Sequence, residues 1–506
     1  MLVEDYNKLF FDKTSYPSVF FQSFLGTSPN WYKILILLFL TINPFAYSLE
    51  SYLIGGEHHF ITGWLFIFEA ICVLSMSLKC CPLPPFSLLT IEAVVLKLTT
   101  PELIYSEVNA NFSVILLLVF VIASIHFHKN ILRFLFTKVI IRVHSKVKLS
   151  LMFLLISAVL SAFLNALTIT VIIITICVGI YTLFTHFYDE HPALQNSVYR
   201  LNKRHFQKFL RSILMHSLVG TAVGGVFTIV GEPQNFLIGK ALNWDFKEFA
   251  FHMFPASLSV LIFSIIVCVL LEKYKLFGYG EEMPEEILEL IKQDELKRTK
   301  KRDTKERTAL VIEALNMLFF VVMLASGVAE AGLIGLASIG LITAFAGINK
   351  DEDIGQSFKD PLPFTALIIL FFAIASVIHH EALFEPITHW ILSFKDSSML
   401  LATYTANALL SMISDNVFVA TVYMSEIQSA FAAGDISKEQ LDALGIAITV
   451  GTNISSIATP NGQAAFLFLL TSTITPLIHL TYGRMILMAL PYTIVLSIIG
   501  ILATCF

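Results

Sequence analysis

One acidic residue, Asp415, lies inside a long apolar stretch of the sequence. Residues 397–414 carry no formal charge, and the next charged residue after Asp415 is Glu426. A carboxylate inside an apolar span is costly and usually functional. It can ligate Na⁺ as a hard oxygen donor or carry a proton, and a site that binds the two ions in turn couples them by competition. A purely structural hydrogen-bonding role is the less favoured interpretation.

The segments on either side of Asp415 are each about half as long as a bilayer span. We therefore predict a helical hairpin over residues 397–430, with a polar tip at Ser414, Asp415 and Asn416. The neutral oxygens of Ser414 and Asn416 would add ligands for a cation.

An earlier segment repeats this design. Residues 149–188 carry no formal charge, which is too long for one span of about 20 residues but suits a second hairpin near residues 149–187. Its tip places Asn165 where the later hairpin has Asp415, and Ser161 where the later one has Ser411.

Each hairpin is followed by a segment interrupted by Gly, Pro and Asn, at residues 220–239 and 450–466. Matching helix breaks in two hydrophobic halves indicate a midplane binding site of a secondary transporter, because unwound carbonyls can coordinate cations. The residues at the breaks are Thr228, Glu232, Pro233, Gln234, Asn235, Thr452, Asn453, Thr459, Pro460 and Asn461. Alternatively they satisfy the unwound backbone, and Glu232 either carries a proton or caps the following half-helix.

The composition excludes a soluble protein. The chain has 506 residues, of which 56% are hydrophobic and 14% charged, and its mean hydropathy is +0.76. Many apolar runs approach the length of a membrane span, so we predict an all-α polytopic membrane protein. No feature supports binding to nucleic acid, and the six cysteines lack metal-ligand spacing and are expected to be buried free thiols.

The charged loops set the expected orientation. Residues 129–148 carry six basic and no acidic residues, which favours an amphipathic helix on the cytoplasmic surface. Residues 431–442 carry one Lys against three acids, as an external loop would. Counting crossings between them places the two hairpins in opposite orientations, which predicts two inverted repeats.

The expected organisation has four parts: a cytoplasmic segment over residues 1–30, a transmembrane half over 31–271, a charged cytoplasmic loop over 272–307 and a second transmembrane half over 308–506. Besides the hairpins and breaks, spans are expected near residues 32–48, 61–78, 85–98, 112–128, 251–271, 309–328, 331–348, 362–378 and 486–505. A cytoplasmic loop is expected over residues 189–211, and the first broken helix over residues 212–242. Residues 284–307 can form a surface helix held by charge pairs, but a solvated linker between the two halves is the favoured interpretation, and an interfacial piece is expected over 380–394.

Other residues admit two interpretations. Glu69, Glu92 and Glu313 fall inside expected spans, and the sequence does not rank them. His379 and His380 are expected to be solvated at a span end, with pH sensing as the alternative. A GxxxG pair, Gly220 and Gly224, favours close helix packing over ligand binding.

Four long strings resemble the NhaB family of bacterial sodium/proton antiporters. They are SDNVFVATVY, GTAVGGVFTIVGEPQN, GTNISSIATPNGQAAFLFLLTS and YGRMILMALPYTIVL, and the resemblance runs from about residue 31 to the end of the chain. It implies the ion transporter superfamily fold, in which each of two inverted repeats has a re-entrant hairpin and a broken helix. It also implies a homodimer, the bacterial inner membrane, exchange of cytoplasmic Na⁺ or Li⁺ for external protons, and no organic cofactor. The expected partners are the lipid bilayer and small cations.

The first hairpin departs from what the resemblance implies. An Asp-Ala-Leu-Thr string is expected there, and this chain has Asn165, Ala166, Leu167 and Thr168. An amide keeps an oxygen ligand but carries neither a proton nor a charge. We expect Na⁺ contacts at Asp415, Asn165 and Asn453, and the proton stoichiometry is open.

Two other functions compete with cation exchange. A sodium-coupled carboxylate symporter of the same fold is expected to have neutral hairpin tips, because an acid such as Asp415 would repel its anionic substrate. An integral membrane metalloenzyme would use His379, His380, Glu381 and His389, but no HExxH-type pair is present. Both are less favoured than an antiporter, which is not an enzyme.

The predicted inversion is testable with single cysteines in a background without native ones. A cysteine replacing Ser437 should react with an impermeant thiol reagent added outside the cell. One replacing Ser197 should react only from the cytoplasmic side. The reverse labelling pattern would contradict the inverted-repeat arrangement.

Overall fold

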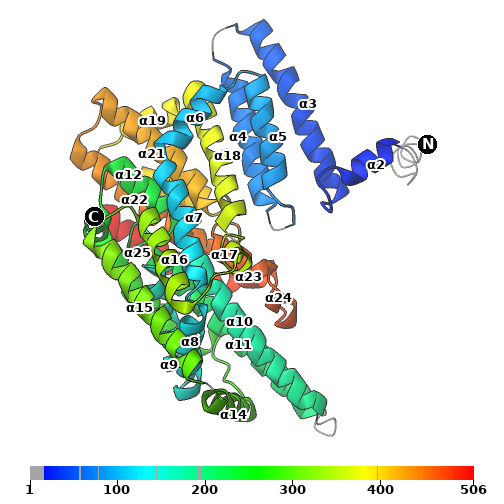
Figure 1. Ribbon diagram of the computed structural model, residues 1–506. Helices are drawn as coiled ribbons and strands as arrows, with labels where there is room; N and C mark the ends of the chain where they lie inside the picture. The colour runs from blue at the N-terminus through cyan, green and yellow to red at the C-terminus, as the bar shows by residue number, and fades with distance from the viewer. Residues whose placement is uncertain are drawn as a thin grey trace. The chain divides into compact units, whose positions relative to one another are not determined.

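The computed structural model describes residues 16–55, 58–77, 79–143, 145–190, 197–301, 303–359, 361–395 and 397–505. These residues form helices joined by short connections, with no β-strand among them (Figure 1). Seven of the described helices are long and apolar enough to cross a membrane, or eight if the bent pair of α6 (Pro101–Ala110) and α7 (Phe112–His126) is one span. The predicted all-α polytopic fold is confirmed.

The chain forms two compact units, and neither coincides with one of the predicted halves. The first comprises the described part of residues 1–110 together with residues 366–387, and the second comprises the remainder. In the first unit, α3 packs against both α4 and α5. Its helices are α2 (Tyr16–Ser23), α3 (Asn30–Leu53), α4 (Phe60–Ser75), α5 (Leu83–Val95), α6 and most of α18 (Pro361–His380).

The second unit begins with α7, α8 (Lys129–Arg142), α9 (Lys146–Ser161) and α10 (Ala166–Glu190). The chain continues through α11 (Ser197–Gly225), α12 (Pro233–Leu242), α13 (Phe246–Tyr274), α14 (Glu285–Lys301), α15 (Thr304–Ser326), α16 (Ala331–Ala346) and α17 (Asp351–Ser357). Its last part contains α20 (Ser397–Ser411), α21 (Asn416–Ala433), α22 (Lys438–Ser455), α23 (Ala464–Thr471), α24 (Ile474–Leu477) and α25 (Tyr482–Cys505), while α19 (Glu385–Leu392) straddles the division.

The second unit contains one helix order twice. Hairpin α9–α10, broken helix α11–α12 and span α13 are matched by hairpin α20–α21, broken helix α22–α23 and span α25. The first hairpin arm packs along the first half of the broken helix in both cases, α9 on α11 and α20 on α22. The second halves cross over, so that α12 packs on α21 and α23 packs on α10. Each hairpin therefore lies beside the break of the other repeat, while the inverted orientation stays a prediction.

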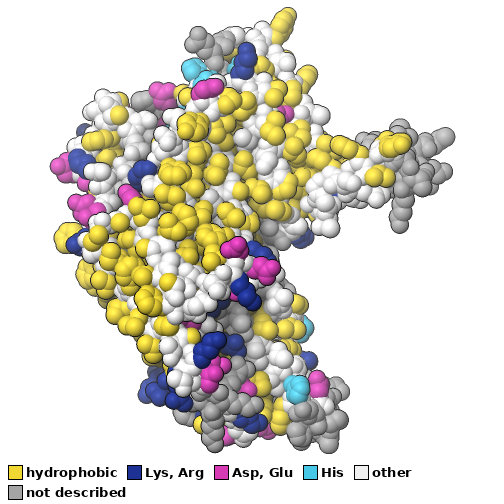
Figure 2. Space-filling view, viewed as in Figure 1, with side chains coloured by type: hydrophobic (Ala, Val, Ile, Leu, Met, Phe, Trp, Pro, Cys, Tyr) yellow, Lys and Arg dark blue, Asp and Glu magenta, His cyan; other side chains and the backbone are white. Residues whose placement is uncertain are grey.

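Part of the outer surface of this unit is apolar. Figure 2 shows hydrophobic side chains covering much of the face formed by α7, α15 and α16. Leu315, Leu318 and Val322 of α15 and Leu333 and Leu336 of α16 are exposed among them. Exposed apolar side chains along such helices suit contact with lipid rather than water.

Helix α11 begins at Ser197, earlier than the expected start at residue 212. The basic residues before 212 had been assigned to a loop. In the structure Phe206, Phe209 and Leu210 are buried, and Lys208 pairs with Glu281 at 2.8 Å, so this turn is an amphipathic helix. Burial alone would raise the pKa of Glu281, but hydrogen bonds from Lys208 and His205 lower it. Residues 191–196 of the same expected loop lie outside the described residues.

The short helices that the sequence missed include α6 and α17. Within residues 284–307, where a solvated linker was favoured, the structure has helix α14, and residues 380–394 contain α19. Both α6 and α17 lie next to predicted spans, where hydropathy gives no separate signal.

The GxxxG pair packs α11 closely against α9. A Cβ atom on Gly220 would lie 2.3 Å from the carbonyl oxygen of Leu154, and one on Gly224 would lie 1.9 Å from that of Ala158. Small residues of this kind let two backbones approach each other in a membrane. The close packing predicted for this pair is confirmed.

We predict that Gly224→Ala strongly destabilises the protein, because the added methyl group would push α9 away from α11. Overpacking commonly costs about 1–3 kcal/mol, and this clash is with backbone. The matched control is Gly179→Ala on α10, where a Cβ meets nothing within 4 Å; it should gain up to about 1 kcal/mol from helix propensity. Thermal unfolding in detergent compares the two, and equal midpoints would contradict the packing described.

Candidate cation site

The two hairpin tips have the same local structure. Asp415 is the N-cap of α21, and its Oδ1 accepts a hydrogen bond from Val417 N at 2.8 Å. Asn165 precedes α10 in the same way, and its Oδ1 accepts from Leu167 N at 2.8 Å. Asp and Asn are favoured at such positions because their short side chains satisfy the free N–H groups of the first helical turn. The tips therefore turn the chain and present one side-chain oxygen group each.

The two helix breaks also match each other. Glu232 is the N-cap of α12 and Gln463 is the N-cap of α23, both with extended backbone. Four residues before each, a threonine hydroxyl donates to a carbonyl of the hairpin in its own half: Thr228 to Ala162 and Thr459 to Met412. A Thr-x-x-Gly-Glu or Thr-x-x-Gly-Gln string thus occurs at both breaks. Gln463 was not among the predicted site residues, and this repeated string was the signal that could have found it.

Tips and breaks meet at one small cavity of about 20 Å³. It is lined by both tip residues, Asn165 and Asp415, by both break residues, Glu232 and Gln463, and by Phe364. A site needs roughly 10–15 Å³ of such space to hold one water molecule. The cavity therefore has room for a single small ion or water and not for an organic substrate.

The charge at this cavity is negative. Its lining contains two acids, Glu232, which is buried, and Asp415, which is half-buried, and no Lys, Arg or His. The first residues of α10, α12, α21 and α23 all line it. Four helix N-termini offer partial positive charge that favours carboxylates, but they do not replace a counter-ion. This arrangement of charges suits a monovalent cation or a proton.

The acids and amides alternate between the two repeats. The first half supplies the amide Asn165 at its tip and the acid Glu232 at its break; the second supplies the acid Asp415 at its tip and the amide Gln463 at its break. Gln463 Nε2 lies 3.5 Å from Glu232 Oε1, and Gln463 Oε1 is buried without a hydrogen-bond partner among the described residues. That oxygen is free to ligate a cation.

Other residues that were predicted as ligands form hydrogen bonds that stabilise the two helix breaks. The amide of Asn453 accepts from Gln234 at 2.7 Å and donates to Asn235 Oδ1 at 2.9 Å. Asn235 in turn donates to the carbonyl oxygens of Gly225 at 2.6 Å and Thr228 at 2.8 Å. Asn453 and Asn235 do not line the cavity, whereas Pro233 and Gln234 do. These contacts hold the two broken helices together.

The remaining predicted residues lie around the tips. Asn416 lines the cavity and donates to Ser456 at 3.2 Å. Ser414 is buried and its hydroxyl has no hydrogen-bond partner. Thr168 belongs to the first turn of α10, and its N–H donates to the carbonyl of Asn165 at 3.1 Å. Residues Thr452, Pro460 and Asn461 belong to the second broken helix or its break and do not line the cavity.

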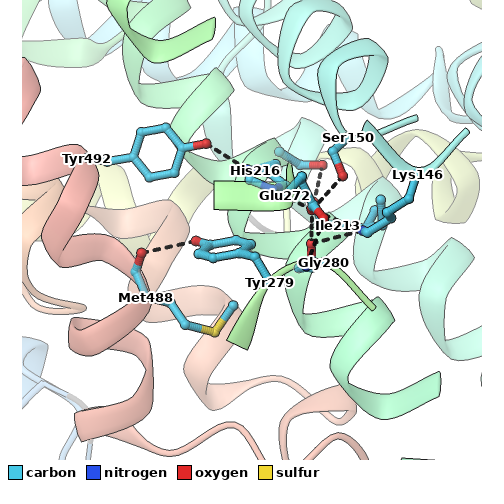
Figure 3. A network of polar contacts seen from close by, with 11 residues as sticks. Lys146, Ser150, Ile213, His216, Glu272, Tyr279, Gly280, Met488 and Tyr492 are labelled. Atoms are coloured by element: carbon cyan, nitrogen blue, oxygen red, sulfur yellow. Dashed lines mark hydrogen bonds and ion pairs between the residues drawn. The ribbon is translucent and has the colours of Figure 1, made fainter. Parts of the chain in front are cut away.

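A separate network of charges lies outside the cavity (Figure 3). Glu272 at the end of α13 accepts from Ser150 at 2.8 Å and His216 at 2.7 Å, and its Oε1 lies 3.2 Å from Lys146 Nζ. The ring of His216 also contacts Tyr492 at 2.7 Å. These buried groups join α9, α11, α13 and α25, so the network fixes the helices that carry the first hairpin and break. Sequence reasoning missed it because its members are far apart in the chain.

The other polar residues singled out in the sequence have structural partners. Glu313 accepts from the side chain of Asn130 and from Ile131 N, both at 2.8 Å, and so caps the start of α8. His379 contacts Glu107 at 2.8 Å and His380 contacts Glu381 at 3.1 Å. The side chain of His389 lies outside the described residues. Among the described residues, no group of three or more His, Cys, Asp or Glu could hold a metal ion.

Known proteins resemble the chain along nearly its whole length. A family model described as "Bacterial Na+/H+ antiporter B (NhaB)" matches residues 13–506. The Na(+)/H(+) antiporter NhaB of Teredinibacter turnerae is 49% identical over 498 residues, which cover 96% of this chain and 98% of the relative.

Proteins of the same name from two other bacteria are similar to this chain to nearly the same extent. That of Pseudomonas entomophila is 48% identical over 489 residues, with 95% of this chain and 96% of the relative covered. That of Pectobacterium carotovorum is 45% identical over 491 residues, with 95% and 92% covered. The family expected from the sequence is therefore confirmed, and this chain belongs to the NhaB family of bacterial antiporters.

Proposed function

We propose that this chain is a secondary transporter that exchanges cytoplasmic Na⁺ or Li⁺ for external H⁺ by alternating access. One observation carries the proposal: Asp415 and Glu232, from different halves of the chain, line a single cavity with room for one small ion. The names of the relatives, Na(+)/H(+) antiporters, support the same function. The chain is a transporter and not an enzyme.

Competition for the two carboxylates couples the ions. When both acids are ionised, the cavity holds two negative charges and attracts a cation. When protons neutralise them, the cavity loses most of its attraction for Na⁺, so the protein binds either ion in turn. Helix N-termini at the tips and breaks moderate the cost of burying the ionised acids. The cation contacts would come from Asp415, Glu232, Asn165 and Gln463.

The first hairpin tip has an amide, Asn165, which cannot carry a proton, so the second titratable group must come from another position. With Asn165 in place, Asp415 is the only acid at either hairpin tip. We infer that Glu232, at the break of the first half, supplies the second titratable group of the site. Asn453, Asn235, Thr459 and Pro460 would then shape the site by holding the breaks rather than by direct contact.

The runner-up, a sodium-coupled carboxylate symporter, fits the cavity poorly. Its anion has several heavy atoms, whereas the space is about 20 Å³, and two acids would repel it. We propose further that the protein resides in the bacterial inner membrane, assembles as a homodimer and needs no organic cofactor.

We predict that Asp415→Asn and Glu232→Gln each reduce exchange at least about tenfold, because losing a contact with a charged group costs roughly 1.5–3 kcal/mol. The assay is dequenching of a pH-sensitive dye in proteoliposomes after Na⁺ is added, with K⁺ as the inactive cation.

Matched controls are Asp442→Asn and Glu439→Gln, which lie outside the cavity lining. Both should exchange like the unmodified protein, and reconstituted amounts should be equal throughout. Full exchange at unchanged apparent Na⁺ affinity in either cavity variant would move the coupling site elsewhere. Dequenching that depends on an added dicarboxylate would favour the symporter.

A further inference from the structure

Two buried acids in the first unit share one amide. Glu69 on α4 and Glu92 on α5 each accept a hydrogen bond from Asn43 Nδ2 on α3, at 2.7 and 2.9 Å. Glu69 and Asn43 are 0% exposed and Glu92 is 9% exposed. The single neutral NH₂ group of Asn43 therefore donates one hydrogen to each of the two carboxyl groups.

The remaining oxygens of this trio lack partners. Glu69 Oε1 and Asn43 Oδ1 are buried and have no hydrogen-bond partner in the described structure. A buried ionised carboxylate with an unsatisfied oxygen is strongly disfavoured, and a second carboxylate nearby adds repulsion. If both acids were ionised, the neutral Asn43 amide would not balance their two negative charges.

Two other buried acids, Glu50 and Glu272, do not have this problem. Glu50, on the same helix as Asn43, accepts from Ile61 N at 2.8 Å and from both Thr62 N at 2.9 Å and Thr62 Oγ1 at 2.7 Å. Glu272 in the second unit has Lys146 and His216 beside it. The Glu69 and Glu92 pair differs from these two acids in its missing compensation and not in burial alone.

Titratable groups on the surrounding elements do not supply the charge. No described Lys, Arg or His forms an ion pair with Glu69 or Glu92. Lys33 on α3 donates instead to the carbonyls of Phe21 and Gln22. The other titratable groups on or beside α3, α4, α5 and α18 are Tyr32, Tyr47, Glu50, Tyr52, His58, His59, Cys72, Lys79, Cys80, Cys81, Lys97, His379, His380 and Glu381.

We propose that Glu69, Glu92 and Asn43 form a second proton-binding site, in the first unit and apart from the cation cavity. One proton on the carboxyl pair removes the repulsion and leaves a single charge for the Asn43 amide to solvate. Na⁺ fits less well, because a hard cation needs several oxygen ligands and the amide presents its nitrogen to both acids. Buried neighbours on the same helices are apolar, among them Phe39, Phe66, Ala70, Val73 and Leu89.

This site would make the packing of α3, α4 and α5 depend on pH. Deprotonation at alkaline pH leaves two buried like charges between the three helices, which weakens the unit. The stability conferred by the bound proton is thus present at lower pH and lost as pH rises. Since neither acid lines the cation cavity, exchange does not require the pair.

The test uses full-length Glu69→Gln with Glu92→Gln, in a background of Asp415→Asn with Glu232→Gln so that the cation cavity does not titrate. The parent background should show an infrared carbonyl band of a protonated carboxylic acid and a thermal midpoint that falls by a few degrees toward alkaline pH. Both features should disappear in the double replacement. Separately, the same pair of replacements in the unmodified chain should leave Na⁺/H⁺ exchange in proteoliposomes unchanged.

Glu50→Gln in the same background is the matched control, because it removes a buried acid of the same unit that is already satisfied. It should lower the midpoint at every pH and keep both the band and the alkaline decline. If the double replacement does not fold, each single one should still abolish the alkaline decline. An unchanged band or decline would overturn the proposal, as would stabilisation by Na⁺ in the parent background that the replacements remove.

Discussion

A broken helix inside the hydrocarbon layer leaves backbone groups that water cannot satisfy, and the second unit is organised around this constraint. Asn165 and Asp415 cap the helices that follow the two tips. At the two breaks, Thr228 and Thr459 donate hydrogen bonds to backbone carbonyl groups of the hairpins. The same side chains that satisfy the backbone thereby bring four helix N-termini to one point.

This convergence explains how a membrane protein keeps two acids beside one small cavity. Helix N-termini stabilise negative charge, which reduces the cost of ionising Asp415 and Glu232 where no basic residue lines the cavity. The network around Glu272 shows the alternative, in which Lys146 and His216 compensate the acid permanently. A permanently compensated acid suits packing, whereas one that still lacks a full counter-charge suits reversible binding of a cation or a proton.

The sequence predicted what depends on local composition. A charge-free stretch too long for one span predicted the first hairpin, a single acid between two apolar arms predicted the second, and Gly and Pro marked the breaks at Glu232 and Pro460. It could not predict contacts between distant segments, such as Gln234 with Asn453 or Asn43 with two acids. Gln463 was missed because the two breaks were matched by their Gly, Pro and Asn residues and were not aligned residue by residue. The predicted start of helix α11 was too late, because the basic residues on its first amphipathic turns were interpreted as a loop.

The central claim is that Na⁺ and protons compete for Asp415 and Glu232. The most direct test adds Na⁺ to the purified protein in weakly buffered detergent solution and records the change in pH. If the two ions compete there, protons are released as Na⁺ binds. K⁺ should release none, and the Asp415→Asn, Glu232→Gln double variant should also release none. Na⁺ binding without proton release, or full release from the double variant, would contradict this claim.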